Sequence, residues 1–249
     1  MLHESGTGEV VALRGKTATA RCAPLAGVPR MARLLSAEAT SDRDLWALLR
    51  ARLPGWNVVC DLDAAQRLIR AGARPRRHAH TLHRDLRADP PPPQWAGLAP
   101  REPLRIGPCD RAAEALVPAW RAAYPPGHPD HVTADDEAVR TSLLQPLLSG
   151  RVLGPLLPHS AVITDAGNAV VAGLIVNDRA GTAWVSDLFR RPGPDTTGLG
   201  GLLLRRALAG LAGEFERVGL AVTVGNPAER LYRRSGFALT ETTMTFTIT

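Results

Sequence analysis

Two glycine-marked blocks near the C-terminus constrain the fold of this chain more than any other feature. The first is the turn Thr197-Gly198-Leu199-Gly200-Gly201, which leads into an apolar run with helical spacing. The second begins at Asn226, about thirty residues later, and ends at Gly236-Phe237. Glycines let backbone N–H groups approach an anion, and a helix N-terminus adds its positive dipole. A glycine turn alone is usually only a turn, but the two blocks in this order predict a phosphate cradle.

Composition limits the remaining choices. The 249 residues are 45% hydrophobic and 22% charged, enough for one large domain or two small ones. The net charge of +6 indicates a polyanionic partner or simply a dispersed arginine surface. Nucleic acid is disfavoured, because no basic cluster carries regularly spaced aromatics. Three separated cysteines, no signal peptide and no membrane-length apolar segment predict a cytoplasmic protein without a membrane partner.

A run of four prolines, Pro90–Pro93, predicts a linker. We expect a small α/β part at 1–88, the linker at 89–102 and a larger domain at 103–249. In that domain we expect helices at 110–124 and 134–148, then three antiparallel strands at 161–164, 169–176 and 183–189. A helix at 199–211, a strand at 220–224, a helix at 227–234 and a final strand at 243–249 follow. The predicted fold class is α/β, with a mostly antiparallel mixed sheet flanked by helices.

This order resembles the GNAT superfamily of acyl-CoA-dependent N-acyltransferases over residues 103–249. The family pattern Gln/Arg-x-x-Gly-x-Gly/Ala aligns with Asp195-Thr196-Thr197-Gly198-Leu199-Gly200, and both glycines match. Its second signature matches Asn226, Ala228, Leu231-Tyr232 and Gly236-Phe237. The first position departs from the pattern, because Asp195 stands where the family has an amide or a basic residue.

The resemblance implies a site for acetyl-CoA as the acyl donor. The backbone of strand residues Leu188, Phe189 and Arg190 would face the pantetheine arm and the thioester. The pyrophosphate would lie on the helix N-terminus, at Thr196, Thr197, Gly198, Leu199, Gly200 and Gly201. Asn226 would bind the pantetheine arm, cap a helix, or do both. The Asp195 carboxylate would repel the pyrophosphate, and the neighbouring arginines are candidates to offset it: Arg190, Arg191 and Arg205.

The resemblance also implies direct attack of an amine on acetyl-CoA in a ternary complex. Tyr232 is the expected general acid for the CoA thiolate, since a phenol stays protonated at neutral pH; the alternative is packing against CoA. Asp187 is expected to bind the amine or take its proton, the alternative being a solvent-facing carboxylate. No metal is expected. His78, His80 and His83 lack a completing ligand and are typical of a strand.

The segment from Tyr124 to His131 is expected to shape the acceptor pocket, with Tyr124, His128 and His131 as substrate contacts. A rigid proline loop with surface histidines is the alternative.

The strand, helix, glycine and strand pattern over residues 56–86 resembles the end of the C-terminal part. It predicts a truncated GNAT-like half, or else an unrelated α/β cap. The alternative function is a non-catalytic acyl-CoA-binding module, and a homodimer is left open.

Overall fold

The computed structural model describes residues 9–249 and separates into two compact units. The first unit contains the described residues up to Thr81 together with Thr240–Thr249, and the second contains Leu82–Leu239. The predicted absence of a signal peptide concerns Met1–Gly6, which lie outside the described residues. Among residues 9–249, no helix combines the length and apolar character that crossing a bilayer requires.

The second unit is built on a sheet in which neighbouring strands pair in the order β6, β7, β8, β9, β10. The pairs from β6 to β9 are antiparallel, and β10 pairs with β9 in parallel. The strands are β6 (Arg105–Pro108), β7 (Ala161–Thr164), β8 (Val170–Arg179), β9 (Thr182–Arg190) and β10 (Arg217–Thr223). A parallel neighbour needs a crossover, and helix α6 (Leu199–Leu211) supplies it.

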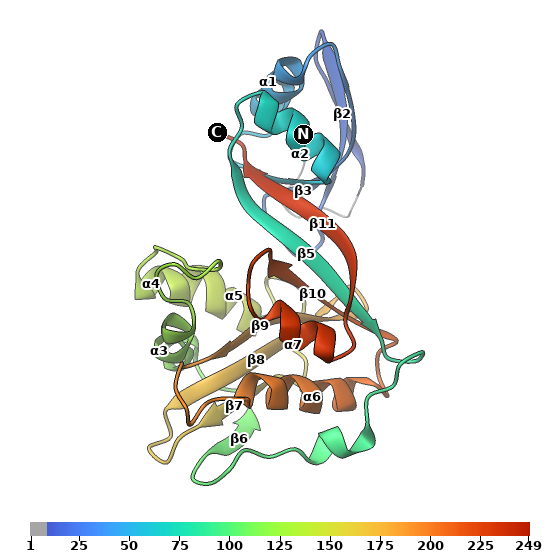
Figure 1. Cartoon of the computed structure of the whole chain (residues 1–249). Coiled ribbons are helices and arrows are strands. Elements are labelled where there is room, and N and C mark those ends of the chain that lie inside the picture. The colour runs from blue at the N-terminus through green and yellow to red at the C-terminus, as the bar shows by residue number, and fades with distance from the viewer. Residues whose placement is uncertain (1–8) are drawn as a thin grey trace. The chain divides into compact units, whose positions relative to one another are not determined.

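Helices cover both faces of this sheet (Figure 1). Helix α6 packs on one face with buried Leu203, Leu204 and Leu208. Helix α3 (Ala113–Ala123) packs on the other face, where Leu116 meets Ile175 of β8 in a separate apolar cluster. Around the second cluster lie α4 (Asp136–Ala138), the π-helical turn Val139–Leu144 and α5 (Gln145–Leu148). The two cores fix β9 between α3 and α6.

A β-bulge interrupts β9 at Ser186. Ile175 of β8 pairs with Asp187, whereas the next residue, Val176, pairs with Val185, so Ser186 is extra. The parallel pairing of β9 with β10 also ends at this point, at Val185 and Leu220. Bulges bend a strand and re-aim its side chains, and they recur beside active sites. Residues 186–190 therefore lose their strand partner on the β10 side.

The first unit repeats the element order of the second. Three strands, a helix, a parallel strand, a helix and a strand follow one another, as they do from β7 to β11. They are β1 (Val11–Arg14), β2 (Ala18–Pro24), β3 (Met31–Ala39), α1 (Asp42–Arg52), β4 (Asn57–Cys60), α2 (Leu62–Arg70) and β5 (Pro75–Asp85), of which the part from Leu82 belongs to the second unit. The predicted GNAT-like character of the N-terminal part agrees with this order.

The C-terminal strand β11 (Ala238–Thr247) pairs antiparallel with β4 and belongs, from Thr240 onward, to the first unit. Phe246 and Ile248 are fully buried in its core. The division at Thr81 precedes the proline run, so the segment predicted as a linker lies within the second unit. There the 3₁₀ turn Pro93–Gly97 packs on α6, and Arg206 donates to the carbonyl of Ala96 at 2.8 Å.

Candidate active site

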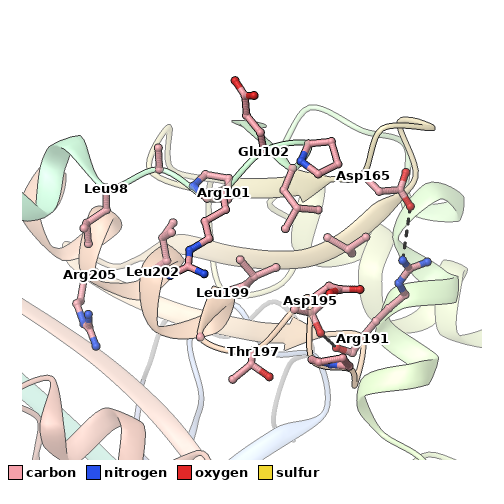
Figure 2. Close-up of a pocket in the computed structure, with 18 residues that line it drawn as sticks. Leu98, Arg101, Glu102, Asp165, Arg191, Asp195, Thr197, Leu199, Leu202 and Arg205 are labelled. Carbon is pink, nitrogen blue, oxygen red and sulfur yellow. Dashed lines mark hydrogen bonds and ion pairs between the residues drawn. The ribbon is translucent and has the colours of Figure 1, made fainter.

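The N-terminus of α6 opens onto a pocket of about 820 Å³ (Figure 2). Gly198 precedes the helix with a φ of 85°, a left-handed conformation that glycine adopts without strain. The N–H groups of Gly198, Gly200 and Gly201 find no acceptor within residues 9–249. These donors sit on the positive end of a 13-residue helix. The geometry is that of an anion cradle.

Charged side chains of both signs line this pocket. Arg191 and Arg205, two of the three arginines expected to offset the Asp195 carboxylate, line the pocket together with Asp195. The third, Arg190, instead donates a hydrogen bond to the backbone carbonyl of Arg191 at 3.1 Å. Arg101 also lines the pocket and extends from the 98–104 segment toward the first turns of α6 (Figure 2). No local pattern pointed to Arg101, because it lies far from the glycine turn in the chain.

A polar cluster surrounds Asp187, just beyond the bulge in β9. Tyr124 donates its hydroxyl to Asp187 Oδ1 at 2.7 Å, and Trp120 donates Nε1–H to Oδ2 at 2.7 Å. Tyr124 also lies 3.2 Å from the carbonyl oxygen of Leu188. Asp187 is therefore not a solvent-facing carboxylate. Burial raises its pKa, against the opposing effect of the hydrogen bonds from Tyr124 and Trp120.

Asp130 brings a second carboxylate to the same cluster. It accepts hydrogen bonds from the hydroxyl of Thr223 and from Asn226 Nδ2, the latter at 2.7 Å. Asn226 Oδ1 in turn accepts from the N–H of Ala228 at 2.8 Å, in the turn that leads into α7 (Glu229–Arg234). The side chain of Asn226 thus joins the loop after α3 to the helix that carries Tyr232. Its expected contact with a pantetheine arm stays a prediction.

Tyr232 is buried, and its ring packs edge-on against Phe237 with centroids 6.1 Å apart. Within the described residues its hydroxyl has no hydrogen-bond partner, and it is not sealed from solvent. Burial raises the pKa of Tyr232, and the nearby charges of Asp187 and Asp130 raise it further. The phenol therefore stays protonated and keeps a donor available. Arg84 holds the end of α7 by donating to the Ser235 carbonyl at 2.7 Å.

The structure gathers most of the predicted site residues into two places in the second unit. The glycine turn, from Thr196 to Leu199, lines the pocket. Tyr124, Asp187, Asn226, His128 and His131 join the polar cluster, with the Tyr124 and His128 rings 5.0 Å apart. The β9 residues lie between these places: Leu188 packs toward Gly200, and Phe189 is buried on the α3 side.

Trp120 and Thr223 belong to the polar cluster but were not predicted as site residues from the sequence. Trp120 fell on the apolar face of a predicted helix, and its indole N–H was the available signal, because a buried tryptophan usually needs an acceptor. Thr223 and Asp130 are far apart in the chain and are brought together by the fold. Within residues 9–249, no group of three or more His, Cys, Asp or Glu side chains is placed to hold a metal.

The equivalent turn in the first unit lacks the cradle. Helix α1 is capped by the side chain of Ser41, which accepts from the N–H of Asp44, and its first turn carries Asp42 and Asp44. An N-terminus that is already capped and bears two carboxylates repels a phosphate. The anion cradle is therefore a feature of the second unit.

Solved structures resemble this chain over more than nine tenths of its length. A GCN5-related N-acetyltransferase of Sphaerobacter thermophilus has a TM-score of 0.55 over 92% of this chain and 76% of its own, at 17% identity. One from Kribbella flavida has a TM-score of 0.53 over 96% and 90%, at 15% identity. A tandem GNAT protein of the clavulanic acid biosynthesis pathway has a TM-score of 0.54 over 94% and 80%, at 16% identity.

A scan against protein-family models and a search of curated proteins gave no match. At the identities above, the likeness to solved structures establishes the fold alone. The chain has the GNAT fold in a two-part arrangement, as the sequence predicted for its C-terminal part.

Proposed function

We propose that this protein is an acetyl-CoA-dependent N-acetyltransferase that transfers an acetyl group to a primary amine in a ternary complex. The observation that carries the proposal is the cradle at the N-terminus of α6, where three glycine N–H groups find no acceptor within residues 9–249 and Gly198 lines an 820 Å³ pocket. Helix N-termini of this kind bind phosphate groups. The pocket lies in a GNAT fold, in which an acyl-CoA is the expected occupant.

The polar cluster supplies the groups that the transfer needs. Asp187 would hold the acceptor ammonium by a charge-assisted hydrogen bond. Tyr232 would protonate the departing CoA thiolate, since its hydroxyl is open and its pKa is raised. The open edge of β9 beyond Val185 offers backbone to the pantetheine arm.

The cysteines support direct transfer over an acyl-cysteine intermediate. Burial raises the pKa of Cys22 and Cys109 to about 11 and that of Cys60 to about 12. A thiol nucleophile acts as the thiolate, and these three side chains stay protonated at neutral pH. The amine itself is therefore the expected nucleophile.

Binding and turnover of acetyl-CoA test the proposal. Wild type should bind acetyl-CoA in calorimetry and release CoA with at least one member of a panel of primary amines. Tyr232→Phe should lower kcat by about 100-fold, as the loss of a general acid does. Its Kd for acetyl-CoA should stay within about twofold, because the ring and its contact with Phe237 remain.

Two outcomes would contradict the proposal in different ways. Full activity of Tyr232→Phe would remove Tyr232 from the chemistry. Tight acetyl-CoA binding without CoA release on any amine would favour the non-catalytic binding module.

A further inference from the structure

We propose that His131, rather than His128 or Asp187, accepts the proton that the acceptor ammonium must lose. This inference deepens the proposed function and rests on it. It starts from the hydrogen-bond partners of the two histidines in the loop after α3, because a backbone carbonyl only accepts and a backbone N–H only donates. The partner of each Nδ1 atom therefore fixes the tautomer of its ring.

His131 Nδ1 lies 2.8 Å from the carbonyl oxygen of Tyr124. Since that oxygen can only accept, Nδ1 carries the proton, and Nε2 of the neutral ring carries the lone pair. Nε2 has no hydrogen-bond partner in the described part of the chain, and it is not sealed from solvent. Taking a proton at Nε2 leaves the bond to Tyr124 intact. His131 is thus held in the form that can act as a base.

His128 has the opposite arrangement. Its Nδ1 accepts the backbone N–H of Asp130 at 3.0 Å, so in the neutral ring the proton sits on Nε2. The lone pair is already used, and protonating Nδ1 would break the bond that shapes the loop. His128 is therefore a donor and a packing partner for the Tyr124 ring.

Asp187 is suited to a different task. Both of its oxygens accept from neutral donors, Tyr124 and Trp120, which fix the plane of the carboxylate. A carboxylate fixed in this way can, in its ionised form, hold an ammonium in place. This leaves the proton transfer itself to a group with an open lone pair.

The loop that carries His131 is anchored on both sides of this residue. Arg121 of α3 donates to the Val132 carbonyl at 2.8 Å and also pairs with Asp136. On the other side of His131, Asp130 is bonded to Thr223 and Asn226. The other titratable groups of the cluster are Asp187 on β9, Tyr232 on α7, Tyr124 at the end of α3 and His128 in the loop. The proton reaches Nε2 directly or through one water.

The proton balance assigns one role to each group. His131 takes a proton from R–NH₃⁺, and the resulting R–NH₂ attacks the thioester carbonyl to form the C–N bond. The C–S bond breaks, and Tyr232 gives its proton to the thiolate. The nitrogen of the addition intermediate returns a proton to Tyr232, and His131 releases its proton to solvent. The products are R–NH–CO–CH₃ and CoA–SH.

Nuclear magnetic resonance tests the tautomers without any need for activity. Long-range ¹H–¹⁵N correlations on the full chain labelled at histidine should show His131 with Nδ1–H and His128 with Nε2–H at alkaline pH. His131→Asn and His128→Asn assign the signals. A His131 ring protonated at Nε2 in its neutral form would overturn the proposal, whether or not an acceptor has been found.

Kinetics test the role. We would measure kcat/KM against pH with acetyl-CoA and an amine that wild type acetylates, chosen from ethanolamine, tyramine, spermidine and lysine. His131→Asn keeps a donor where Nδ1 was but has no basic nitrogen. It should lower kcat/KM about 100-fold at pH 7 and abolish the ionisation on the acidic side. The deficit should shrink as the pH rises and more amine is uncharged.

His128→Asn is the matched control, because Asn Oδ1 can still accept the Asp130 N–H. It should keep the acidic-side ionisation, whatever its effect on the size of kcat/KM. If the acidic-side ionisation of kcat/KM persists in His131→Asn, the group that accepts the ammonium proton is Asp187 and not His131. If the wild-type protein releases no CoA with any amine, that result counts against the proposed function. The tautomers of His131 and His128 would still be determined by nuclear magnetic resonance.

Discussion

At the residue scale, the site depends on Asp187, a carboxylate whose charge is partly removed from water. Asp187 carries a raised pKa because burial disfavours its charge more than Tyr124 and Trp120 favour it. The sequence singled out Asp187 from its place on a strand, but the partners that hold it come from another helix. Such a charge is costly to the fold and useful to a cationic substrate.

Asp187→Asn should stabilise the protein and impair it as an enzyme. A carboxyl with a higher pKa in the folded state binds its proton more tightly when folded, so its contribution to the free energy of unfolding is greatest at acid pH. That contribution falls as the pH rises through the raised pKa. The variant removes the buried charge, and Asn can still accept from Trp120 while its amide donates to the Tyr124 oxygen.

The midpoint of thermal unfolding of Asp187→Asn should therefore rise by roughly 2 to 4 °C at pH 7. The gain should disappear at acid pH, where wild type is protonated as well. Scanning calorimetry at both pH values, with KM for the amine, checks this. A lower midpoint at pH 7 would show that the carboxylate is stabilised by its partners overall.

At the element scale, α6 shows how a helix start becomes a binding site. Its element type was predictable, because leucine and alanine recur at helical spacing after a glycine turn. The pocket above it was not, since Arg101 and its neighbours reach α6 from a segment about a hundred residues earlier. The bulge at Ser186 was equally hidden, because one extra residue leaves no periodic trace.

Gly200→Ala should separate the cradle from the fold. A Cβ at Gly200 would meet only the Leu188 side chain, at an ordinary contact distance of 3.9 Å. Alanine in a helix is better than glycine by roughly 0.5 to 1 kcal/mol, so the melting temperature should hold or rise. The methyl group would stand on the surface proposed for the pyrophosphate, and the Kd for acetyl-CoA should rise about 10-fold or more.

Gly213→Ala is the control for this variant, because its Cβ would meet nothing within 4 Å and it lies beyond the far end of α6. Its affinity for acetyl-CoA should match that of wild type. Equal affinity in Gly200→Ala would place the pyrophosphate elsewhere.

At the scale of the whole molecule, the last strand of the chain belongs to the first unit. Strand β11 follows α7 in sequence, yet it pairs with β4, and its Phe246 and the following Ile248 fill the core of the first unit. The sequence predicted this strand and assigned it to residues 103–249. Strand pairing depends on partners far away in the chain, which periodicity does not reveal.

Phe246→Ala should destabilise the first unit by about 3 to 5 kcal/mol, because a fully buried ring is replaced by a cavity. Amide hydrogen exchange at Val58 and Val59 of β4 should accelerate, since both pair with β11. Leu239→Ala, on the same strand but 42% exposed, should change little. Unchanged protection of β4 in Phe246→Ala would mean that β11 is dispensable for that sheet.

The sequence by itself determined the kinds of element, the GNAT order of the C-terminal part and most of the candidate residues, because glycine turns, helical spacing and strand alternation are local properties. Only the tertiary structure decided that Trp120, Asp130 and Thr223 complete the cluster around Asp187 and Tyr232. It also decided which histidine keeps an open lone pair, since a tautomer is set by a partner in space. Residue types and their local spacing can be read from the sequence. Hydrogen-bond partners and burial depend on the fold, because they require segments that are distant in sequence to be close in space.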